Sequence, residues 1–206
     1  MVATQIAARG LTNPRLLAVF EAVPRHLFVP AAERAAAYYD EPLPIGFGQT
    51  ISQPYIVALM TDLVGAADEQ RKQPMTLLEV GSGSGYQAAI LAALGHRVVT
   101  LERLAPLADR ARLTLTSLGV KNVEVLCRDG SKGAADLAPP GGFDGILVAA
   151  ASPIVPQEML EQLAIGGRLV IPVGPTFAQD LMVYERRPEG YVHEVELPVR
   201  FVPLVS

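Results

Sequence analysis

From residue 76 onward, short apolar runs alternate with segments whose apolar residues recur at helical spacing. The runs with the length and composition of buried strands are residues 76–80, 97–101, 123–127, 143–149 and 168–173. The intervening segments with helical spacing are residues 86–94, 105–118 and 156–163. This alternation predicts right-handed crossovers and a doubly wound, mainly parallel α/β sheet with helices on both faces.

The chain before residue 76 has a different pattern. Residues 12–23 carry an apolar stripe that predicts a helix, and Asn13 followed by Pro14 is a suitable start for it. Prolines then recur through residues 24–48, which predicts an irregular wrap, before residues 55–64 return to an apolar helical pattern.

The last part of the chain predicts an antiparallel hairpin. Its two strand-like runs, residues 181–186 and 191–195, flank the turn sequence Arg-Pro-Glu-Gly at 187–190. We therefore expect a single domain over residues 1–206. Residues 1–75 would form its N-terminal helical and irregular segment, and residues 76–206 its α/β core with the C-terminal hairpin.

A glycine-rich turn joins the first predicted strand of the core to the first predicted helix. Gly81, Gly83 and Gly85 let the backbone bend and approach a ligand, and the following helix presents N–H groups without partners. A dinucleotide fingerprint has its third glycine three residues after the second, whereas the interval here is two. Glu79 would also repel a pyrophosphate, but it could hold an ammonium group. The motif therefore resembles the first motif of S-adenosylmethionine-dependent methyltransferases, with a ligand-free turn as the alternative.

Acidic residues also follow the next two predicted strands. Glu102 ends one of them, where a carboxylate can accept both hydroxyls of a ribose; an exposed salt bridge is the competing interpretation. Asp129 and Gly130 follow the other, where they could contact an adenine or form a plain Asp-Gly turn. These residues predict a nucleoside site at the carboxyl edge of the sheet.

Ser52 lies just before a predicted helix that begins near Pro54. Ser52 or Gln53 therefore occupies the helix-cap region, and the Ser52 hydroxyl either caps the helix or faces the ligand cleft. Farther along, Ala149, Ala150 and Ala151 stand where many amino- and base-methylating enzymes have a polar cluster. We therefore expect an acceptor from which the protein need not remove a proton.

Composition narrows the classes of partner. The chain has 17 Lys and Arg against 21 Asp and Glu, a net charge of -4, and no basic run, so we expect no nucleic-acid partner. The single cysteine, Cys127, lies in an apolar strand that we expect to be buried, so its thiol should be inert. The histidines lack metal-ligand spacing, so no metal is expected. No apolar run approaches the roughly 20 residues of a membrane span. We expect a cytoplasmic monomer that does not bind membranes.

Segments along nearly the whole chain resemble the protein-L-isoaspartate O-methyltransferase family, in particular its bacterial members. They are Val-Pro-Arg-His-Leu-Phe-Val at 23–29, Gly-Gln-Thr-Ile-Ser-Gln-Pro-Tyr at 48–55, the glycine motif at 79–85, Gly-Gly-Arg-Leu-Val-Ile-Pro-Val-Gly at 166–174 and Arg-Phe-Val-Pro-Leu at 200–204. The second and last segments are far more particular to this family than the glycine motif. The chain departs from the commoner pattern at Arg128, where many members have glycine, and at Tyr55, where many have histidine.

The resemblance implies methyl transfer from S-adenosyl-L-methionine to the free carboxylate of L-isoaspartyl residues in damaged proteins or peptides. D-aspartyl residues are a second candidate acceptor. The products would be S-adenosyl-L-homocysteine and an ester that begins repair through a succinimide. Ser52 would be the active-site residue. The implied cofactor-binding residues are Thr50, Ile51, Ser52, Gln53, Glu79, Gly81, Ser82, Gly83, Gly85, Glu102, Arg103, Asp129 and Gly130. The implied substrate-binding residues are Ser52, Gln53, Tyr55 and Val202.

Two other functions stay open at the level of sequence. One is a methyltransferase that acts on a small molecule or on RNA, although the lack of a basic surface counts against RNA. The other is a cofactor-binding module without catalysis.

Overall fold

The computed structural model describes residues 1–205, and its centre is a seven-stranded sheet. The strands are β3 (Thr76–Val80), β4 (Arg97–Glu102), β5 (Val123–Cys127), β6 (Phe143–Val148), β7 (Leu163–Val173), β8 (Gln179–Arg187) and β9 (Gly190–Val199). They lie in the order β5-β4-β3-β6-β7-β8-β9. The strands from β5 to β7 are parallel, whereas β8 and β9 add to this sheet as an antiparallel hairpin. The predicted fold class is confirmed.

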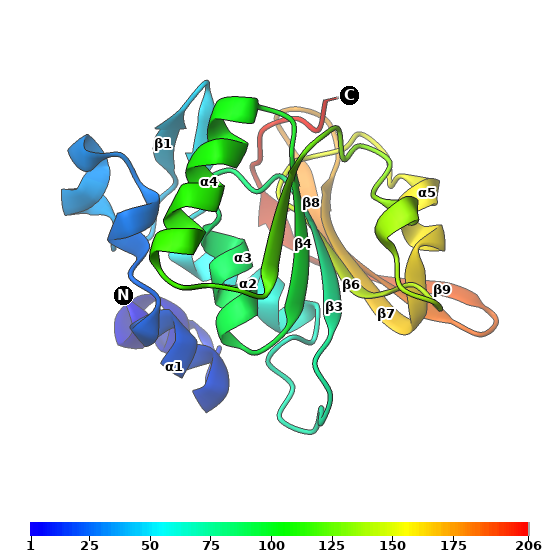
Figure 1. The fold of residues 1–206 in the computed structure, drawn as a ribbon. Coiled ribbons are helices and arrows are strands. Elements are labelled where there is room, and N and C mark those ends of the chain that lie inside the picture. Colours follow the sequence, from blue (N-terminus) through cyan, green and yellow to red (C-terminus); the bar gives the residue numbers. More distant parts are fainter. Residues whose placement is uncertain (206) are drawn as a thin grey trace.

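Helices cover both faces of the sheet unequally. They are α1 (Pro14–Ala22), α2 (Pro54–Leu63), α3 (Tyr86–Ala93), α4 (Ala105–Ser117) and α5 (Gln157–Glu161). Figure 1 shows α1 to α4 on one side of the sheet and α5 on the other. The predicted start of α1 is confirmed, because Asn13 Oδ1 accepts hydrogen bonds from the N–H groups of Arg15 at 2.9 Å and Leu16 at 3.2 Å.

The predicted irregular wrap contains regular structure that the sequence pattern does not reveal. Short 3-10 turns at Arg25–Phe28 and Ala31–Ala36 lead into a hairpin of β1 (Leu43–Gly46) and β2 (Gln49–Ile51). These strands are too short for an alternation of polar and apolar residues to identify them. Phe47 at the tip has φ 55°, between two glycines that also have positive φ.

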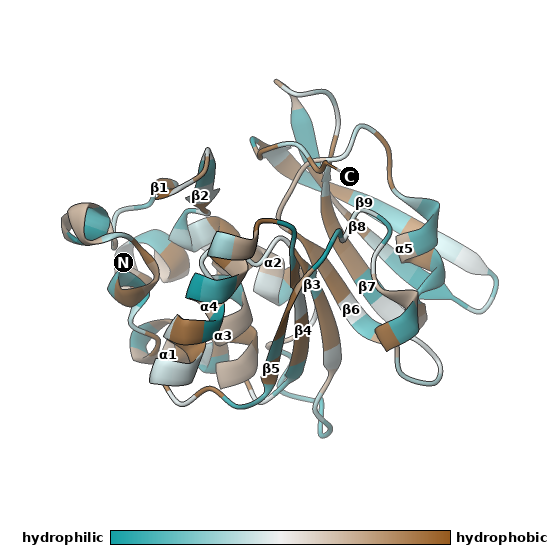
Figure 2. Cartoon of the chain, turned by 45° about the horizontal axis from the view of Figure 1, so that its top comes forward, coloured by the Kyte–Doolittle hydropathy of each residue, from teal (hydrophilic) through white to brown (hydrophobic). Residues whose placement is uncertain are grey.

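The N-terminal segment shares a hydrophobic core with α3 and α4. Phe20 and Phe28 pack edge-on against Tyr86, the first residue of α3, with ring centroids 6.2 and 5.4 Å away. Figure 2 shows the apolar character of the central strands and the more polar hairpin of β8 and β9. The shared core fixes the β1–β2 hairpin relative to the carboxyl ends of the parallel strands.

The prediction that Cys127 is buried is wrong. Cys127 ends β5, which is the edge strand of the sheet, and it is exposed to solvent. An edge strand has a neighbour on one side only, so an apolar run there need not be covered at its end.

Candidate active site

The sheet contains a topological switch point between β3 and β6. The chain runs from β3 outward to β4 and β5, then returns to place β6 on the other side of β3. Ligands of such sheets bind outside the carboxyl ends of the strands at this point. A cleft of about 300 Å³ lies there and is called the main cleft below. Its lining consists of Phe47, Gln49, Val80, Gly81, Gly83, Leu101, Glu102, Arg103, Leu104, Arg128, Gly130, Ala149, Ala150 and residues 202–205.

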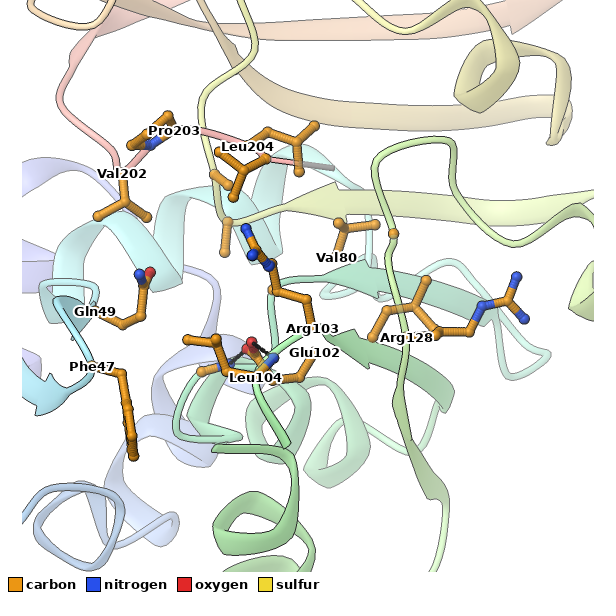
Figure 3. A pocket seen from close by; sticks show the side chains of 17 residues that line it. Phe47, Gln49, Val80, Glu102, Arg103, Leu104, Arg128, Val202, Pro203 and Leu204 are labelled. Atoms are coloured by element: carbon orange, nitrogen blue, oxygen red, sulfur yellow. Dashed lines mark hydrogen bonds between the residues drawn. The ribbon is translucent and has the colours of Figure 1, made fainter. Parts of the chain in front are cut away.

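Three distant parts of the chain form the walls of the main cleft. Figure 3 shows Val202, Pro203 and Leu204 along one side, Phe47 and Gln49 along another, and Glu102 beside Arg103 and Leu104 on a third. The tail that contains Val202 is held by two backbone hydrogen bonds. Ala151 N–H donates to Val202 O at 2.8 Å, and Leu204 N–H donates to Ala151 O at 2.7 Å.

The glycine turn is fastened to the end of β4. The N–H groups of Gly81 and Ser82 both donate to Leu101 O, at 2.8 and 3.0 Å. Gly81 has φ 92°, and a Cβ added there would lie 3.5 Å from the Ala149 Cβ. A glycine is therefore required by the backbone conformation, and it leaves the floor of the main cleft open. The geometry allows a ligand to approach the backbone of the glycine turn closely, as the sequence predicts.

Glu102 is a fixed and buried acceptor in the main cleft. Its Oε2 accepts the Gly83 N–H at 2.9 Å and its Oε1 accepts the Leu104 N–H at 3.0 Å, with the residue only 6% exposed. A carboxylate has about four lone-pair positions, so two remain for donors in the cleft. The hydroxyls of a ribose are such donors.

Glu79 is buried beneath the glycine turn. Its Oε2 accepts the Thr100 hydroxyl at 2.5 Å, and Ser82 Oγ lies 2.6 Å from the same hydroxyl oxygen. Burial raises the pKa of Glu79 to about 8; the Thr100 hydrogen bond opposes this rise and the charge of Glu102 adds to it. Glu79 lines a small cavity of about 40 Å³, called the inner cavity. A cation that entered this cavity would favour the ionised form of Glu79.

The Asp-Gly turn after β5 contributes its glycine to the main cleft. A Cβ at Gly130 would lie 2.8 Å from Val80 Cγ1, so the neighbouring strands leave no room for a larger residue. Asp129 faces its own turn, accepting from the Ser131 N–H at 2.8 Å and the Ser131 hydroxyl at 3.1 Å. Arg128 lines the cleft while its guanidinium pairs with exposed Asp136 through two hydrogen bonds. The structure therefore brings Gly130, and not the carboxylate of Asp129, to the cleft.

Ser52 lines a second pocket of about 510 Å³, called the side pocket. Ser52, Gln53 and Thr50 line the side pocket, and Ala149 and Val202 line both it and the main cleft. Ser52 also lines the inner cavity. Gln53, not Ser52, occupies the cap position of α2, and the Gln53 side chain makes no cap hydrogen bond. The structure therefore favours the interpretation in which Ser52 faces the cleft.

Tyr55 has a different environment from the one the resemblance implies. The Arg9 guanidinium lies 3.3 Å from the centroid of the Tyr55 ring, and the Tyr55 N–H donates to Asp40 Oδ1 at 3.0 Å. Arg9 itself pairs with Asp40 at 2.9 Å and lines the side pocket in place of Tyr55.

The remaining predicted residues divide into two groups. Glu79, Ser82 and Ile51 line the inner cavity, and Arg103 lines the main cleft. Gly85 lines none of these cavities: its φ of 85° begins α3, and a Cβ there would lie 3.3 Å from the Ala111 Cβ. The residues that sequence reasoning missed are Gln49, Phe47 and Thr100. The Gly-Phe-Gly sequence at 46–48 indicates a turn, but Thr100 meets Glu79 only through the register of β3 and β4.

No group of three or more His, Cys, Asp or Glu side chains in residues 1–205 is arranged to hold a metal ion. The helices of the same residues include none with the length and apolar character needed to cross a membrane.

Comparisons with known proteins agree with this geometry. The family model described as protein-L-isoaspartate(D-aspartate) O-methyltransferase matches residues 1–206. The protein-L-isoaspartate O-methyltransferases of Methanoregula boonei and Methanospirillum hungatei are 54% and 51% identical over the whole chain, which covers 91% and 92% of their lengths.

Solved structures give the same result at the level of the fold. A protein-L-isoaspartate O-methyltransferase superposes with a TM-score of 0.82 at 27% identity, covering 94% of this chain and 62% of that one. A Plasmodium falciparum structure described by the same name, in complex with S-adenosyl-L-homocysteine, has a TM-score of 0.83 at 23% identity and covers 99% and 96% of the two chains. The match of the family model over the full length and the two close relatives show that the chain belongs to the protein-L-isoaspartate(D-aspartate) O-methyltransferase family.

Proposed function

We propose that the main cleft binds S-adenosyl-L-methionine and that the side pocket presents the acceptor carboxylate to it beside Ser52. The activity is that of the family: a methyl group passes to the free carboxylate of an isoaspartyl residue, and the ester begins repair of the damaged chain. The single observation that carries the assignment of the site is that Ser52 lines the side pocket and the inner cavity, and that Ala149 lines both of these and also the main cleft, which contains Gly81 and Glu102.

The residues of the main cleft fit this cofactor. Fixed lone pairs on Glu102 suit two ribose hydroxyls, and Gly81 and Gly130 leave space where a side chain would intrude. Glu79 lines the inner cavity, which shares Gly81 and Ala149 with the main cleft, and its carboxyl group suits the ammonium end of an amino-acid portion. No phosphate-binding cluster is needed. When bound, the cofactor supplies an electrophilic methyl group.

The chain itself contributes orientation and the exclusion of water. A carboxylate with a pKa near about 4 is ionised at neutral pH, so no side chain has to remove a proton. Ala149 and Ala150 give the cleft apolar walls, and the Ser52 hydroxyl can donate a hydrogen bond that holds one acceptor oxygen. Orientation of this kind can lower the barrier by about 7 to 11 kcal/mol. Ser52 is thus proposed as a positioning donor and not as a covalent nucleophile.

We further propose that residues 1–206 act as one methyltransferase domain, in monomeric form, in the cytoplasm and without a nucleic-acid partner. The core shared by the N-terminal segment with α3 and α4 supports a single domain. The net charge of -4 supports the absence of a nucleic-acid partner, and the single cysteine suits a reducing cytoplasm.

A transfer assay tests the function directly. Radiolabelled S-adenosyl-L-methionine is supplied with an isoaspartyl peptide and with the aspartyl peptide of the same sequence. We expect label in the isoaspartyl peptide only, and transfer to neither would contradict the proposal. The Ser52→Ala variant tests the site: turnover should fall about a hundredfold, as expected for a misplaced reactant, while affinity for S-adenosyl-L-homocysteine is retained. Full turnover in this variant would show that Ser52 does not position the acceptor.

A further inference from the structure

Arg25 is a buried cation behind the Ser52 segment. Its side chain has 0% exposure, and it begins the 3-10 turn Arg25–Phe28. Its Nε donates to Ala37 O at 2.8 Å, and its Nη2 donates to Ser52 O at 2.7 Å. One guanidinium therefore joins Ala37, at the end of the second 3-10 turn, to Ser52, the residue that follows β2. Arg25 lines neither the main cleft, the side pocket nor the inner cavity.

A scaffold role alone accounts poorly for a charge in this position. Burial lowers the pKa of Arg25 to about 10, so the side chain still carries its charge at neutral pH. Arg25 Nη1 and the hydroxyl of Tyr86 are both buried without a hydrogen-bond partner within residues 1–205. The Arg25 Cζ lies 4.9 Å from the centroid of the Tyr86 ring. An apolar side chain of similar size often stabilises a fold as well as a buried charge does, or better.

The hydrogen bond to Ser52 determines which way the next peptide group faces. The backbone of residues 1–205 contains no cis peptide bond, so the C=O of Ser52 and the N–H of Gln53 point in opposite directions. The C=O faces Arg25 in the protein interior. The N–H of Gln53 accordingly faces away from Arg25, and both Ser52 and Gln53 line the side pocket.

We propose that Arg25 is a positioning residue for the acceptor: by holding the Ser52 carbonyl, it orients the following peptide group so that the Ser52 hydroxyl and the Gln53 N–H together receive the isoaspartyl carboxylate. A hydroxyl and an N–H are the kinds of donor that a carboxylate accepts, and neither requires a charge in the pocket itself. The inference rests on the proposed function of Ser52. It adds a residue that acts through Ser52 and Gln53 without touching substrate or cofactor.

The test combines Arg25→Met, Arg25→Lys, Ser52→Ala and the double variant Arg25→Met with Ser52→Ala. Turnover of an isoaspartyl peptide is normalised to the fraction of protein that binds S-adenosyl-L-homocysteine in calorimetry, so that unfolded protein does not count. The matched control is Arg186→Met. Arg186 lies on the β8–β9 hairpin, far from Ser52, and it also donates to two backbone carbonyls, Glu161 O at 3.2 Å and Leu163 O at 2.5 Å.

We expect Arg25→Met to lower the normalised kcat at least about tenfold, since small misplacements of a reactant are costly, with affinity for S-adenosyl-L-homocysteine changed less than about twofold. In the Ser52→Ala background the same substitution should lower kcat less than about threefold, because residues that act together have non-additive effects. Arg25→Lys keeps the charge but replaces the two nitrogens of a fixed planar fork with a single nitrogen, so it should fold and show an intermediate loss. Arg186→Met should keep its normalised kcat.

Two results would overturn the inference about Arg25 without contradicting the proposed role of Ser52. One is a normal kcat in the folded fraction of Arg25→Met or, should that variant not fold, of Arg25→Lys. The other is an equal loss with and without the Ser52 hydroxyl, which would indicate a general structural role. Wild-type turnover in Ser52→Ala would instead refute the proposed function of Ser52, and the inference with it.

Discussion

Glu102 illustrates how one residue connects the backbone of the site to its ligand. Its two oxygens each accept one backbone N–H, so the carboxylate is held in place before any ligand arrives. We expect Glu102→Ala to weaken binding of S-adenosyl-L-homocysteine about ten- to a hundredfold, because hydrogen bonds to a charged group contribute about 1.5 to 3 kcal/mol. Titration calorimetry measures this loss, with Glu124→Ala on the exposed face of β5 as the control. An unchanged affinity would remove Glu102 from the cofactor site.

Glu79 gives the stability of the protein a pH dependence of definite sign. Its pKa rises from an ordinary 4.5 to about 8, chiefly through burial. Between these two values the native protein holds a proton that the unfolded chain has released, so the free energy of unfolding falls as pH rises and this contribution is lost above about pH 8. Glu79→Gln removes the titration while keeping an acceptor for Thr100.

Denaturant unfolding of both proteins from about pH 5 to about pH 8 checks this expectation. The wild type should lose stability relative to Glu79→Gln by at most about 1.4 kcal/mol per pH unit. Parallel pH profiles for the two proteins would mean that Glu79 titrates near its ordinary value in the folded state.

At the scale of elements, the predictability of the structure depends on the length and continuity of each apolar run. β3 and β5 occupy the predicted residues, because each is a short apolar run with polar residues or glycine at its ends. The boundary between the helix predicted at 156–163 and the strand predicted at 168–173 is wrong, because the helix ends earlier and the strand begins earlier than predicted. β7 begins already at Leu163, and the glycines at 166 and 167 interrupt the apolar pattern without ending the strand.

The site was predictable only where a local motif carries it. Spacing along the chain identifies Gly81, Glu102 and Gly130 because each lies at or just after the end of a strand. Gln49 reaches the main cleft, and Arg25 reaches the backbone of Ser52, through the packing of segments that are far apart in sequence, and no local pattern records such contacts.

Packing between elements makes a glycine in β6 indispensable. A Cβ on Gly145 would lie 2.4 Å from Val64 Cγ2 and 2.9 Å from Leu77 Cδ2, where α2 and β3 meet β6. Overpacking of a core usually costs about 1 to 3 kcal/mol, so we expect Gly145→Ala to lower the free energy of unfolding by about this amount. The double variant with Val64→Ala, which removes the nearest atom, should be less destabilised than the sum of the single variants. Additive losses in denaturant unfolding would show that this contact is not the cause.

At the scale of the whole molecule, the main cleft has its walls because the N-terminal segment and the C-terminal tail both reach the switch point of the sheet. The hairpin of β1 and β2 supplies one wall, and the tail at 202–205 supplies another through its bonds to Ala151. Phe201 N–H adds a further attachment, since it donates to Gln179 Oε1 at 2.8 Å. The strands themselves do not depend on the tail, because their ladders are complete by the end of β9.

A chain ending after Val199 should therefore remain folded and lose cofactor binding. S-adenosyl-L-homocysteine at about one hundred times the Kd of the intact protein should stabilise that protein by about 2.7 kcal/mol, and a first tenfold loss of affinity should remove about 1.3 kcal/mol of that gain. We expect at least one such step in the truncated chain, measured by denaturant unfolding with and without ligand. Val195→Thr, a change on the exposed face of β9, should keep the full gain. A truncated chain that gained as much as the intact one would show that the tail covers the cleft without contributing to binding, and that the glycine turn and Glu102 hold the cofactor alone.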